Sequence, residues 1–201
     1  MGLSLRNVTL TVYDGDKPIF SEFGEMLFTH FGVSGPLVLS ASSHIRDMKP
    51  NRYHLAIDLK PALDSEQLDA RIQRDFAENL NRDFINGIRK LLPAKLIPVI
   101  TRLSGIPEEQ KINSVTKEQR RRFGELIKAF PVRVSGFRPI DEAIVTSGGI
   151  LVREIDPHTM ESKLVKNIYF AGEVIDVDAV TGGFNLQVAW STAYAAASHI
   201  Q

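Results

Sequence analysis

Two adjacent glycines near the end of the chain stand where a helix could receive a ligand. Gly182 and Gly183 directly precede a helical pattern that runs roughly from Asn185 to Ile200. The first N–H groups of a helix have no partner inside it, and the helix dipole makes this end positive. A ligand group that carries or gains negative charge would therefore be stabilised in front of this helix.

A carboxylate follows a predicted strand shortly before those glycines. The apolar stretch NIYFA (167–171) predicts a strand buried on both faces, and Gly172 and Glu173 come directly after it. Ligands of open α/β sheets bind at the carboxyl ends of strands. There a carboxylate can accept hydrogen bonds from sugar or ribityl hydroxyls, while a reduced flavin carries negative charge at its N1–C2 edge. The pattern predicts part of a nucleotide or flavin cradle, but a strand, turn and helix without a ligand explain it equally well.

The elements that would position these residues change character along the chain. Alternating apolar residues predict strands at 3–13 and 53–61, and a turn is expected at 14–17. Short strands broken by glycines fill 18–36. About the first sixty residues therefore predict a small antiparallel sheet or barrel.

The middle of the chain has a helical period instead. Apolar residues recur every four positions in the stretch that begins at Asp64, with Ser65 as the candidate N-cap. Further short helices are expected to end at Pro93 and Gly105, and Thr116 is the candidate cap of another helix. Strand patterns then return before the last helix, in PVRVSGF (131–137), EAIVTSGG (142–149), ILVREID (150–156) and NIYFAGEV (167–174).

Composition argues against several classes of protein. The 201 residues suit one large domain or two small ones, and 24 basic side chains balance 24 acidic ones. Zero net charge creates no field that would attract nucleic acid or an anionic membrane, so neither partner is expected. The dense charge run KEQRRR (117–122) is read as a solvated helix face. Cysteine is absent, the histidines show no metal-ligand spacing, and no leader or bilayer-spanning run is visible, which fits a cytoplasmic protein without a metal.

Three long motifs resemble those of a known family. They are GEMLFTHFGVSGPLVLSAS (24–42), EAIVTSGGILVREIDPHTMESK (142–163) and NIYFAGEVIDVDAVTGGFNLQVAWSTAYAAA (167–197). The chain is similar over essentially its whole length to the bacterial NAD(P)/FAD-dependent oxidoreductases that include aminoacetone oxidase and 3-dehydro-bile-acid reductase-like flavoproteins. One departure is visible, since Ala179 stands where the family has glycine.

The resemblance implies an α+β fold with two domains. An insert domain would cover residues 1–130, with a small antiparallel β-barrel over about 1–62 and a helical subdomain over about 63–130. Residues 131–201 would supply the C-terminal strands and helix of a glutathione-reductase-like FAD domain. The GxGxxG phosphate loop of such domains does not occur in this sequence. We therefore expect a fragment of a larger flavoenzyme or a remnant gene product, with Met1-Gly2 as an artificial or alternative start.

The resemblance also assigns roles to individual residues. The implied cofactor-binding residues are Gly172 and Glu173 at the ribityl and pyrophosphate region, Gly182, Gly183, Phe184 and Asn185 at the isoalloxazine edge, and Thr146, Ser147, Gly148 and Gly149 on a neighbouring strand end. The implied substrate-side residues are Thr29, His30, Gly32, Ser34 and Gly35. His30 is the candidate catalytic residue, as a proton donor or substrate contact, because histidine titrates near neutrality. A hydrogen-bonded loop histidine without a catalytic role is the competing interpretation.

The function expected from these features is part of an FAD-dependent oxidoreductase acting on an unidentified small molecule. NAD(P)H is a candidate electron partner. This chain alone is expected to bind FAD weakly or not at all and to be inactive, because it lacks the phosphate loop. The alternative is a non-catalytic binding or interaction module built on the barrel and helices. A homodimer is expected through exposed strand edges such as IYFAGEV (168–174).

Overall fold

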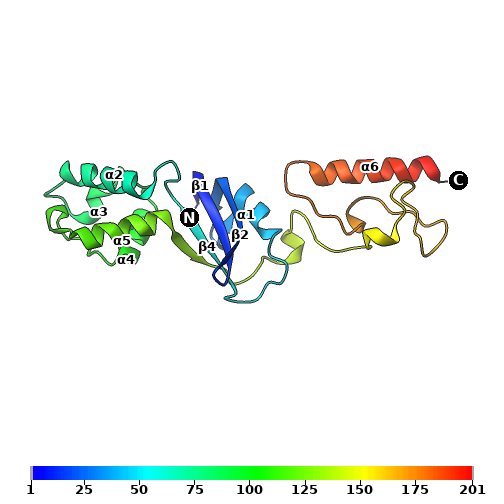
Figure 1. Ribbon diagram of the computed structural model, residues 1–201, viewed down its shortest axis with the longest axis horizontal. Coiled ribbons are helices and arrows are strands. Elements are labelled where there is room, and N and C mark those ends of the chain that lie inside the picture. The colour runs from blue at the N-terminus through cyan, green and yellow to red at the C-terminus, as the bar shows by residue number, and fades with distance from the viewer. Residues whose placement is uncertain (1, 201) are drawn as a thin grey trace. The chain divides into compact units, whose positions relative to one another are not determined.

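The computed structural model describes residues 2–200, and the chain divides into two compact units (Figure 1). The first unit contains the residues up to Ala41 together with Met48–Ser135. The second contains Ser42–Asp47 together with the residues from Gly136 onward. A sheet and a group of helices make up the first unit, whereas loops and one long helix make up the second.

A five-stranded antiparallel sheet forms one part of the first unit. Its strands are β1 (Leu3–Asp14), β2 (Lys17–Phe28), β3 (Val33–Ser34), β4 (Tyr53–Asp58) and β5 (Phe130–Arg133), in the order β3-β2-β1-β4-β5. The sheet curls into a half-barrel. Alternation in β1 places Val8, Leu10 and Val12 in the core, and a shift in register between Leu5 and Val8 allows Leu5 to be buried as well. The α+β class, with a barrel-like sheet and a helical part, is confirmed.

Two glycines at the first two strands occupy positions where a larger residue would be strained or would clash. Gly15 has a φ of 58° in the two-residue turn between β1 and β2, a conformation that glycine adopts without strain. Gly24 lies in β2 opposite Leu37 of α1 (Pro36–Ser42), and a Cβ atom at Gly24 would come within 3.1 Å of the Leu37 side chain. The missing side chain therefore lets α1 pack closely on β2.

Four α-helices form the other part of the first unit. They are α2 (Ser65–Ala77), α3 (Phe84–Gly87), α4 (Ile97–Ser104) and α5 (Lys117–Lys128), followed directly by β5, which returns to the sheet beside β4. The single-turn 3-10 helix η1 (Ile112–Ser114) precedes α5. Their shared core contains Phe84 and Phe123, both fully buried, whose rings meet edge to face with centroids 5.2 Å apart.

The caps of these helices partly match the predictions. Thr116 caps α5 as predicted, and its hydroxyl accepts a hydrogen bond from the backbone N–H of Gln119. The cap of α2 is Asp64 and not Ser65, because the Asp64 carboxylate accepts the Gln67 backbone N–H at 2.8 Å while the Gln67 side chain bonds back to the Asp64 N–H. Gly105 ends α4, as predicted, and it adopts the left-handed conformation. The expected helix before Pro93 is shorter, since α3 ends at Gly87.

The second unit has less regular structure than the sequence predicted. It contains α6 (Phe184–His199) and three single-turn 3-10 helices, η2 (Ile140–Glu142), η3 (Val152–Glu154) and η4 (Gly172–Val174). Where strands were expected over 142–174, the described residues form only isolated bridges, namely Ile150 with Ile175, Ile155 with Ser162, and Glu161 with Tyr169. A strand needs a neighbour along its length, and the predicted double-sided burial of NIYFA is absent, since Ile168 is 43 % exposed.

Within residues 2–200, no helix combines the length and the apolar character that crossing a bilayer requires.

Candidate functional site

Gly148 and Gly149 lie beside the segment that follows Glu173. The Ile150 N–H donates to the Val174 carbonyl oxygen at 2.8 Å, and the Asp176 N–H donates to the Ile150 oxygen at 2.9 Å. This short parallel bridge brings the Gly149 α-carbon against the backbone of 174–176, where a Cβ would clash. Gly149 also has a φ of 142°, so both backbone conformation and close approach require glycine there.

Gly172 ties the same segment to the last helix. Its N–H donates to the Thr192 Oγ1 atom of α6 at 3.0 Å, and its φ of 73° suits glycine. A Cβ on Gly172 would lie 3.7 Å from the Ala189 Cβ, so small residues on both sides let the turn sit close to the helix. Glu173 follows immediately, and its side chain is exposed.

The start of α6 is held open. Gly183 is the N-cap in the left-handed conformation with a φ of 92°, and no side chain caps the first N–H groups of the helix. Phe184 is 57 % exposed. The Asn185 side chain accepts the Ala179 N–H and donates to the Ala179 oxygen, both at 2.9 Å. Asn185 therefore fixes the loop before the helix through its amide, which leaves the backbone N–H groups at the helix start as the donors for a ligand.

Ser147 belongs to a small polar cluster that the sequence did not reveal. Its hydroxyl lies 3.4 Å from the Asp178 carboxylate and accepts a hydrogen bond of 3.3 Å from Arg46. Arg46 and Asp178 are also 3.5 Å apart as an ion pair, with side-chain exposures of 68 % and 16 %. No spacing signal links Arg46 to Ser147 in the sequence, because only folding brings these distant positions together.

The predicted cofactor-binding residues therefore gather within the second unit. The 146–149 segment contacts 174–178, Gly172 contacts α6, and Asn185 contacts Ala179. At Gly148 and Gly183 an added Cβ would meet nothing within 4 Å, so both positions face open space. Uncapped backbone N–H groups and two glycines therefore stand at the start of α6, while the turn that carries Gly172 and Glu173 lies against the middle of the helix, near Ala189 and Thr192.

The surrounding surface of α6 is apolar. Leu186, Trp190 and Tyr194 recur every four residues along one face and are 66 %, 73 % and 78 % exposed. The opposite side of the helix packs through Ala196 on Ile155, Met160 and Ile175, which form the small core of this unit. An exposed apolar stripe next to a glycine-rich turn is typical of a binding surface.

The predicted substrate-side residues lie in the first unit. The Thr29 hydroxyl accepts the N–H groups of Phe31 and Gly32, at 3.3 and 3.2 Å, and so closes the turn after β2. The His30 ring stands edge to face with Phe31, 5.0 Å between centroids. Thr29 and His30 line a hollow of about 410 Å³ together with Leu27, Phe28 and residues 2–4.

Ser34 and Gly35 shape the backbone near this hollow. Ser34 pairs with Leu27 in the β2–β3 ladder, which places it beside a residue that lines the hollow. Gly35 has a φ of 97°, and a Cβ there would come within 3.1 Å of the Met26 Cα. Gly32 has a φ of 152° and closes the turn with Thr29. Ser34 and Gly35 therefore contact the backbone of β2 at Met26 and Leu27, next to the lining of the hollow.

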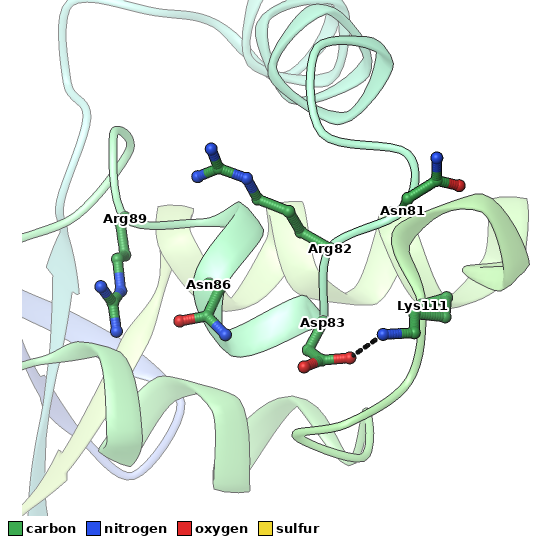
Figure 2. Close-up of a pocket in the computed structure, with 6 residues that line it drawn as sticks. All are labelled: Asn81, Arg82, Asp83, Asn86, Arg89 and Lys111. Carbon is green, nitrogen blue, oxygen red and sulfur yellow. Dashed lines mark hydrogen bonds and ion pairs between the residues drawn. The ribbon is translucent and has the colours of Figure 1, made fainter.

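A second hollow, of about 290 Å³, lies in the helical part. Its lining is polar, with three basic residues, one acidic residue and two amides, and consists of Asn81, Arg82, Asp83, Asn86, Arg89 and Lys111 (Figure 2). Lys111 forms an ion pair with Asp83 at 2.6 Å. Sequence reasoning missed this hollow, because Lys111 reaches it only through the fold.

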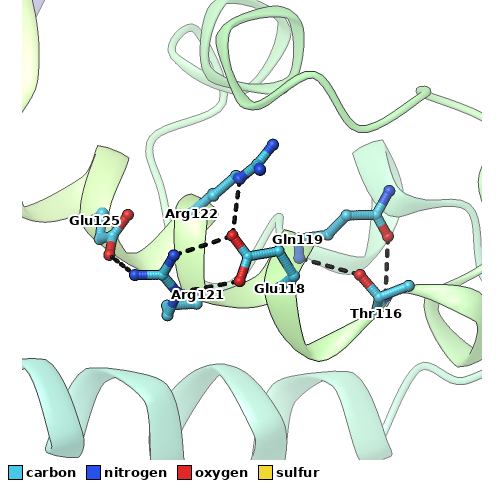
Figure 3. Close-up of polar contacts among 6 residues, drawn as sticks. All are labelled: Thr116, Glu118, Gln119, Arg121, Arg122 and Glu125. Carbon is cyan, nitrogen blue, oxygen red and sulfur yellow. Dashed lines mark hydrogen bonds and ion pairs between the residues drawn. The ribbon is translucent and has the colours of Figure 1, made fainter.

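The arginines of the charged run 117–122 on α5 form ion pairs with nearby carboxylates. Arg121 bonds to Glu118 and Glu125, and Arg122 bonds to Glu118, while the cap residues Thr116 and Gln119 close the start of the helix (Figure 3). Hydrogen bonds from Arg121 and then Arg122 lower the pKa of Glu118. Arg120 pairs with Asp69 of α2 at 2.7 Å. The arginines of this run are thus matched by carboxylates, in agreement with a solvated helix face.

Metal ligands do not assemble in this fold. Across residues 2–200, no three histidine, aspartate or glutamate side chains come together as a metal ion would require.

Comparison with known proteins identifies relatives of the whole chain. Residues 1–145 match the family described as the HI0933-like protein barrel and H2TH domain. A ribosomal RNA dihydrouridine synthase of Haemophilus influenzae is 33 % identical over 199 residues, which are 99 % of this chain and 46 % of the relative. A 3-dehydro-bile acid delta(4,6)-reductase of Clostridium scindens is 29 % identical over 191 residues, 90 % of this chain and 45 % of the relative.

A third relative has the same name as the first. It is a ribosomal RNA dihydrouridine synthase of Escherichia coli, 33 % identical over 175 residues, which are 87 % of this chain and 42 % of that protein. The chain thus spans less than half the length of these curated relatives. The bile-acid reductase is of the kind expected from the three motifs, so the family resemblance is confirmed. The chain belongs to the HI0933-like protein family.

Proposed function

We propose that this chain supplies the flavin-facing and substrate-facing parts of an FAD-dependent reductase that acts on a carbon–carbon double bond conjugated to a carbonyl group. The observation that carries the proposal is that contacts within the second unit join the three segments in turn: 147–150 meets 174–178, Gly172 meets the middle of α6 at Thr192, and Asn185 holds Ala179 before the open start of α6. The relatives' names supply the bond type. Dihydrouridine arises when the uracil C5=C6 bond, conjugated to the C4 carbonyl, gains two hydrogens, and a 3-oxo steroid with delta(4,6) double bonds presents the same arrangement.

The residues present fit the isoalloxazine and ribityl half of FAD. The uncapped N–H groups at the start of α6 can stabilise the negative charge of a reduced flavin ring. Glu173 can accept hydrogen bonds from ribityl hydroxyls, and Gly148 and Gly183 leave room for a ring to approach the backbone. When bound, the flavin would supply a hydride to the electron-poor carbon of the double bond.

The proposed tasks of the other site residues are positioning and proton supply. The Asn185 amide and the Gly172 to Thr192 bond hold the turns that carry the N–H groups and Glu173. The largely apolar hollow beside Thr29 and His30, within the first unit, is our candidate for a substrate contact. His30 keeps the two roles that the resemblance implies, a proton donor or a substrate contact.

The ADP half of FAD has no counterpart among these residues. The sequence contains no GxGxxG loop, and the relatives are about twice as long as the stretch that this chain matches. We therefore propose that the phosphates are held by a part of such proteins that this chain does not span, and that the chain alone binds flavin weakly. NAD(P)H stays a candidate electron donor.

The test is a flavin titration of the purified chain, read by quenching of its single tryptophan, Trp190, which is exposed on α6. We expect riboflavin and FAD to bind with similar, weak affinity, because only the shared half of the two molecules makes contact. Gly183→Ala should weaken this binding, since it adds a methyl group in the open space before the helix.

The matched control is Gly105→Ala. Gly105 is also left-handed, with a φ of 69°, and an added Cβ there would meet nothing within 4 Å, but it ends α4 in the first unit. It should lose stability without losing flavin affinity. Absence of any flavin binding, or an equal loss in both variants, would refute the proposed cofactor site. It would favour the alternative of a binding or interaction module.

A further inference from the structure

A short segment far from the C-terminal part of the sequence contributes one arginine to the second unit. Residues 42–47 lie in sequence between α1 and β4, but they belong to the second unit together with the residues from Gly136 onward. Ile45 of this segment is buried, whereas the side chain of Arg46, which follows it, is 68 % exposed. The fold therefore fixes the backbone beside residue 46 and leaves the guanidinium group accessible to a ligand.

The guanidinium group of Arg46 joins the glycine segment 146–149 to the loop before α6. Its Nη1 atom donates to the Ser147 hydroxyl at 3.3 Å and lies 3.5 Å from the Asp178 carboxylate. Ser147 directly precedes two glycines, and Asp178 directly precedes the residue whose backbone the Asn185 amide holds. Within the described residues 2–200, the Nε and Nη2 atoms of Arg46 form no hydrogen bond, so these donors remain for a ligand.

The charges around this loop are predominantly negative. Residues 136–201 carry eight Asp and Glu against four Lys and Arg, and three of these carboxylates, those of Glu173, Asp176 and Asp178, occur within the stretch 173–178. An anionic ligand beside them would be repelled. Arg46 offsets the Asp178 carboxylate, which is only 16 % exposed and is therefore weakly screened by water.

We propose that Arg46 is a residue of the flavin site, where its guanidinium group balances the Asp178 carboxylate and so favours the reduced, anionic flavin over the oxidised, neutral one. The inference rests on the proposed function and adds a residue that sets the redox preference of that site. A cation held beside the ring strengthens binding of the form that carries negative charge. The uncapped start of α6 acts in the same direction through its partial positive charge.

The experiment compares oxidised and reduced riboflavin as ligands of the whole chain. Binding is read by quenching of Trp190 fluorescence, without oxygen and at mildly alkaline pH, so that the reduced ring is anionic. We expect the wild-type chain to bind the reduced form more tightly. Arg46→Gln should lower the ratio of the two affinities about fivefold, as expected for a charge contact that water partly screens. This change corresponds to a fall of about 20 mV in the two-electron potential of the bound flavin.

Variants of the same ion pair separate a charge effect from a loss of structure. Arg46→Lys should keep most of the preference for the reduced form, because it keeps the charge. Asp178→Asn should raise the preference, because it removes a carboxylate. Asp178→Asn combined with Arg46→Gln should bring the ratio back toward the wild-type value. A contact that only stabilised the loop would not give effects of opposite sign.

The matched control is Arg138→Gln. Arg138 is also an exposed arginine of the second unit that pairs with a carboxylate, but its partner Glu142 is a near neighbour in sequence and lies outside the glycine segments. The affinity ratio should stay within about twofold of wild type. Melting curves of all variants verify that they remain folded.

Three results would overturn the proposal. The first is an unchanged ratio in Arg46→Gln, and the second is an equal loss of affinity for both redox forms, which would make Arg46 a purely structural contact. The third comes from FAD, whose phosphates are another possible partner of the guanidinium group and are absent from riboflavin. A loss of FAD affinity in both redox states, without an effect on riboflavin, would assign Arg46 to a phosphate.

Failure of the proposed function would give a different result. The wild-type chain would then bind neither form of riboflavin, and the inference would fall together with the site on which it rests. If only the inference is wrong, the wild-type chain binds riboflavin and Arg46→Gln leaves its redox preference unchanged. The two failures are therefore distinguishable in one set of titrations.

Discussion

The first and second units of this chain differ in how completely they bury their apolar side chains. In the first unit, sheet and helices bury residues such as Leu10, Ile57 and Phe123 completely. In the second unit, a core of four buried residues supports a helix that exposes Leu186, Trp190 and Tyr194. The backbone N–H groups of Ile150, Gly172 and Asp176 donate hydrogen bonds that hold the glycine-bearing turns in place. The candidate cofactor residues therefore lie in the unit with the smaller core, as expected where binding segments come from the less stable parts of a protein.

The largest expected effect comes from the core of the first unit. Phe123→Ala should cost about 3–5 kcal/mol of unfolding free energy, because it leaves a cavity beside Phe84. Urea denaturation followed by circular dichroism measures it. The control Phe137→Ala removes a ring that is 54 % exposed in the second unit and should cost less than about 0.5 kcal/mol. Similar costs for the two variants would contradict the difference between the units.

A smaller effect is expected from the turns of the second unit. Gly149→Ala should lower the free energy of local unfolding by about 1–3 kcal/mol. The added methyl group would clash with the 174–176 backbone, and the φ of 142° at residue 149 is strained for alanine. Amide exchange over 172–176 should accelerate, while exchange in β1 and α5 stays unchanged. Gly136→Ala is the control, as an added Cβ there would meet nothing within 4 Å. Accelerated exchange throughout the first unit would show that the units do not unfold separately.

The exposed face of α6 should affect association more than stability. We expect self-association of the chain at high protein concentration, read by light scattering, since contiguous exposed apolar side chains tend to bury one another. Leu186→Gln with Trp190→Gln should reduce this association and change the unfolding free energy by less than about 0.5 kcal/mol. The expected strand edge at 168–174 forms no regular strand, so α6 is now the better candidate for the contact. A wild-type chain that stays monomeric would contradict it.

The smallest effects are those of pH on single carboxylates. A hydrogen bond from Arg120 lowers the pKa of Asp69 in the first unit, and the His158 backbone N–H lowers the pKa of Asp156 in the second. A lowered folded-state pKa gives stability that is present above the ordinary value of 3.8 and is lost as pH falls through the folded value. Asp69→Asn and Asp156→Asn should each remove part of the acid-induced loosening, in its own unit only. Titration of the carboxyl carbons by NMR measures both, and an unshifted Asp69 would contradict its pairing.

The sequence predicted the first unit well because its signals are local. Alternating apolar residues predicted β1 and β4, and the helical spacing of apolar residues predicted α2. The cap residue Thr116 predicted the start of α5. The error at Ser65 arose because Asp64 has equal capping chemistry, and only the bond to Gln67 decides between them. The prediction made α3 too long, because an apolar run before a proline is compatible with both a helix and a turn.

The second unit and the hollows could not be predicted in the same way. Apolar stretches such as NIYFA have the composition of strands, but strands form only where a neighbour supplies hydrogen bonds. The Arg46–Ser147–Asp178 cluster and the meeting of Lys111 with Arg82 and Asp83 depend on tertiary folding. At Gly149, Gly172 and Gly183 the structure shows backbone conformations that favour glycine, and the role of these residues in cofactor binding stays a prediction.

The most direct test of the cofactor site is hydrogen–deuterium exchange of the whole chain with and without FAD. We predict slower exchange in three segments, 146–150, 172–176 and 182–187, and no change in β1 to β5. That result would place the flavin at the glycine turns and the start of α6. Protection confined to the first unit, or no protection at saturating FAD, would contradict a flavin site in the second unit.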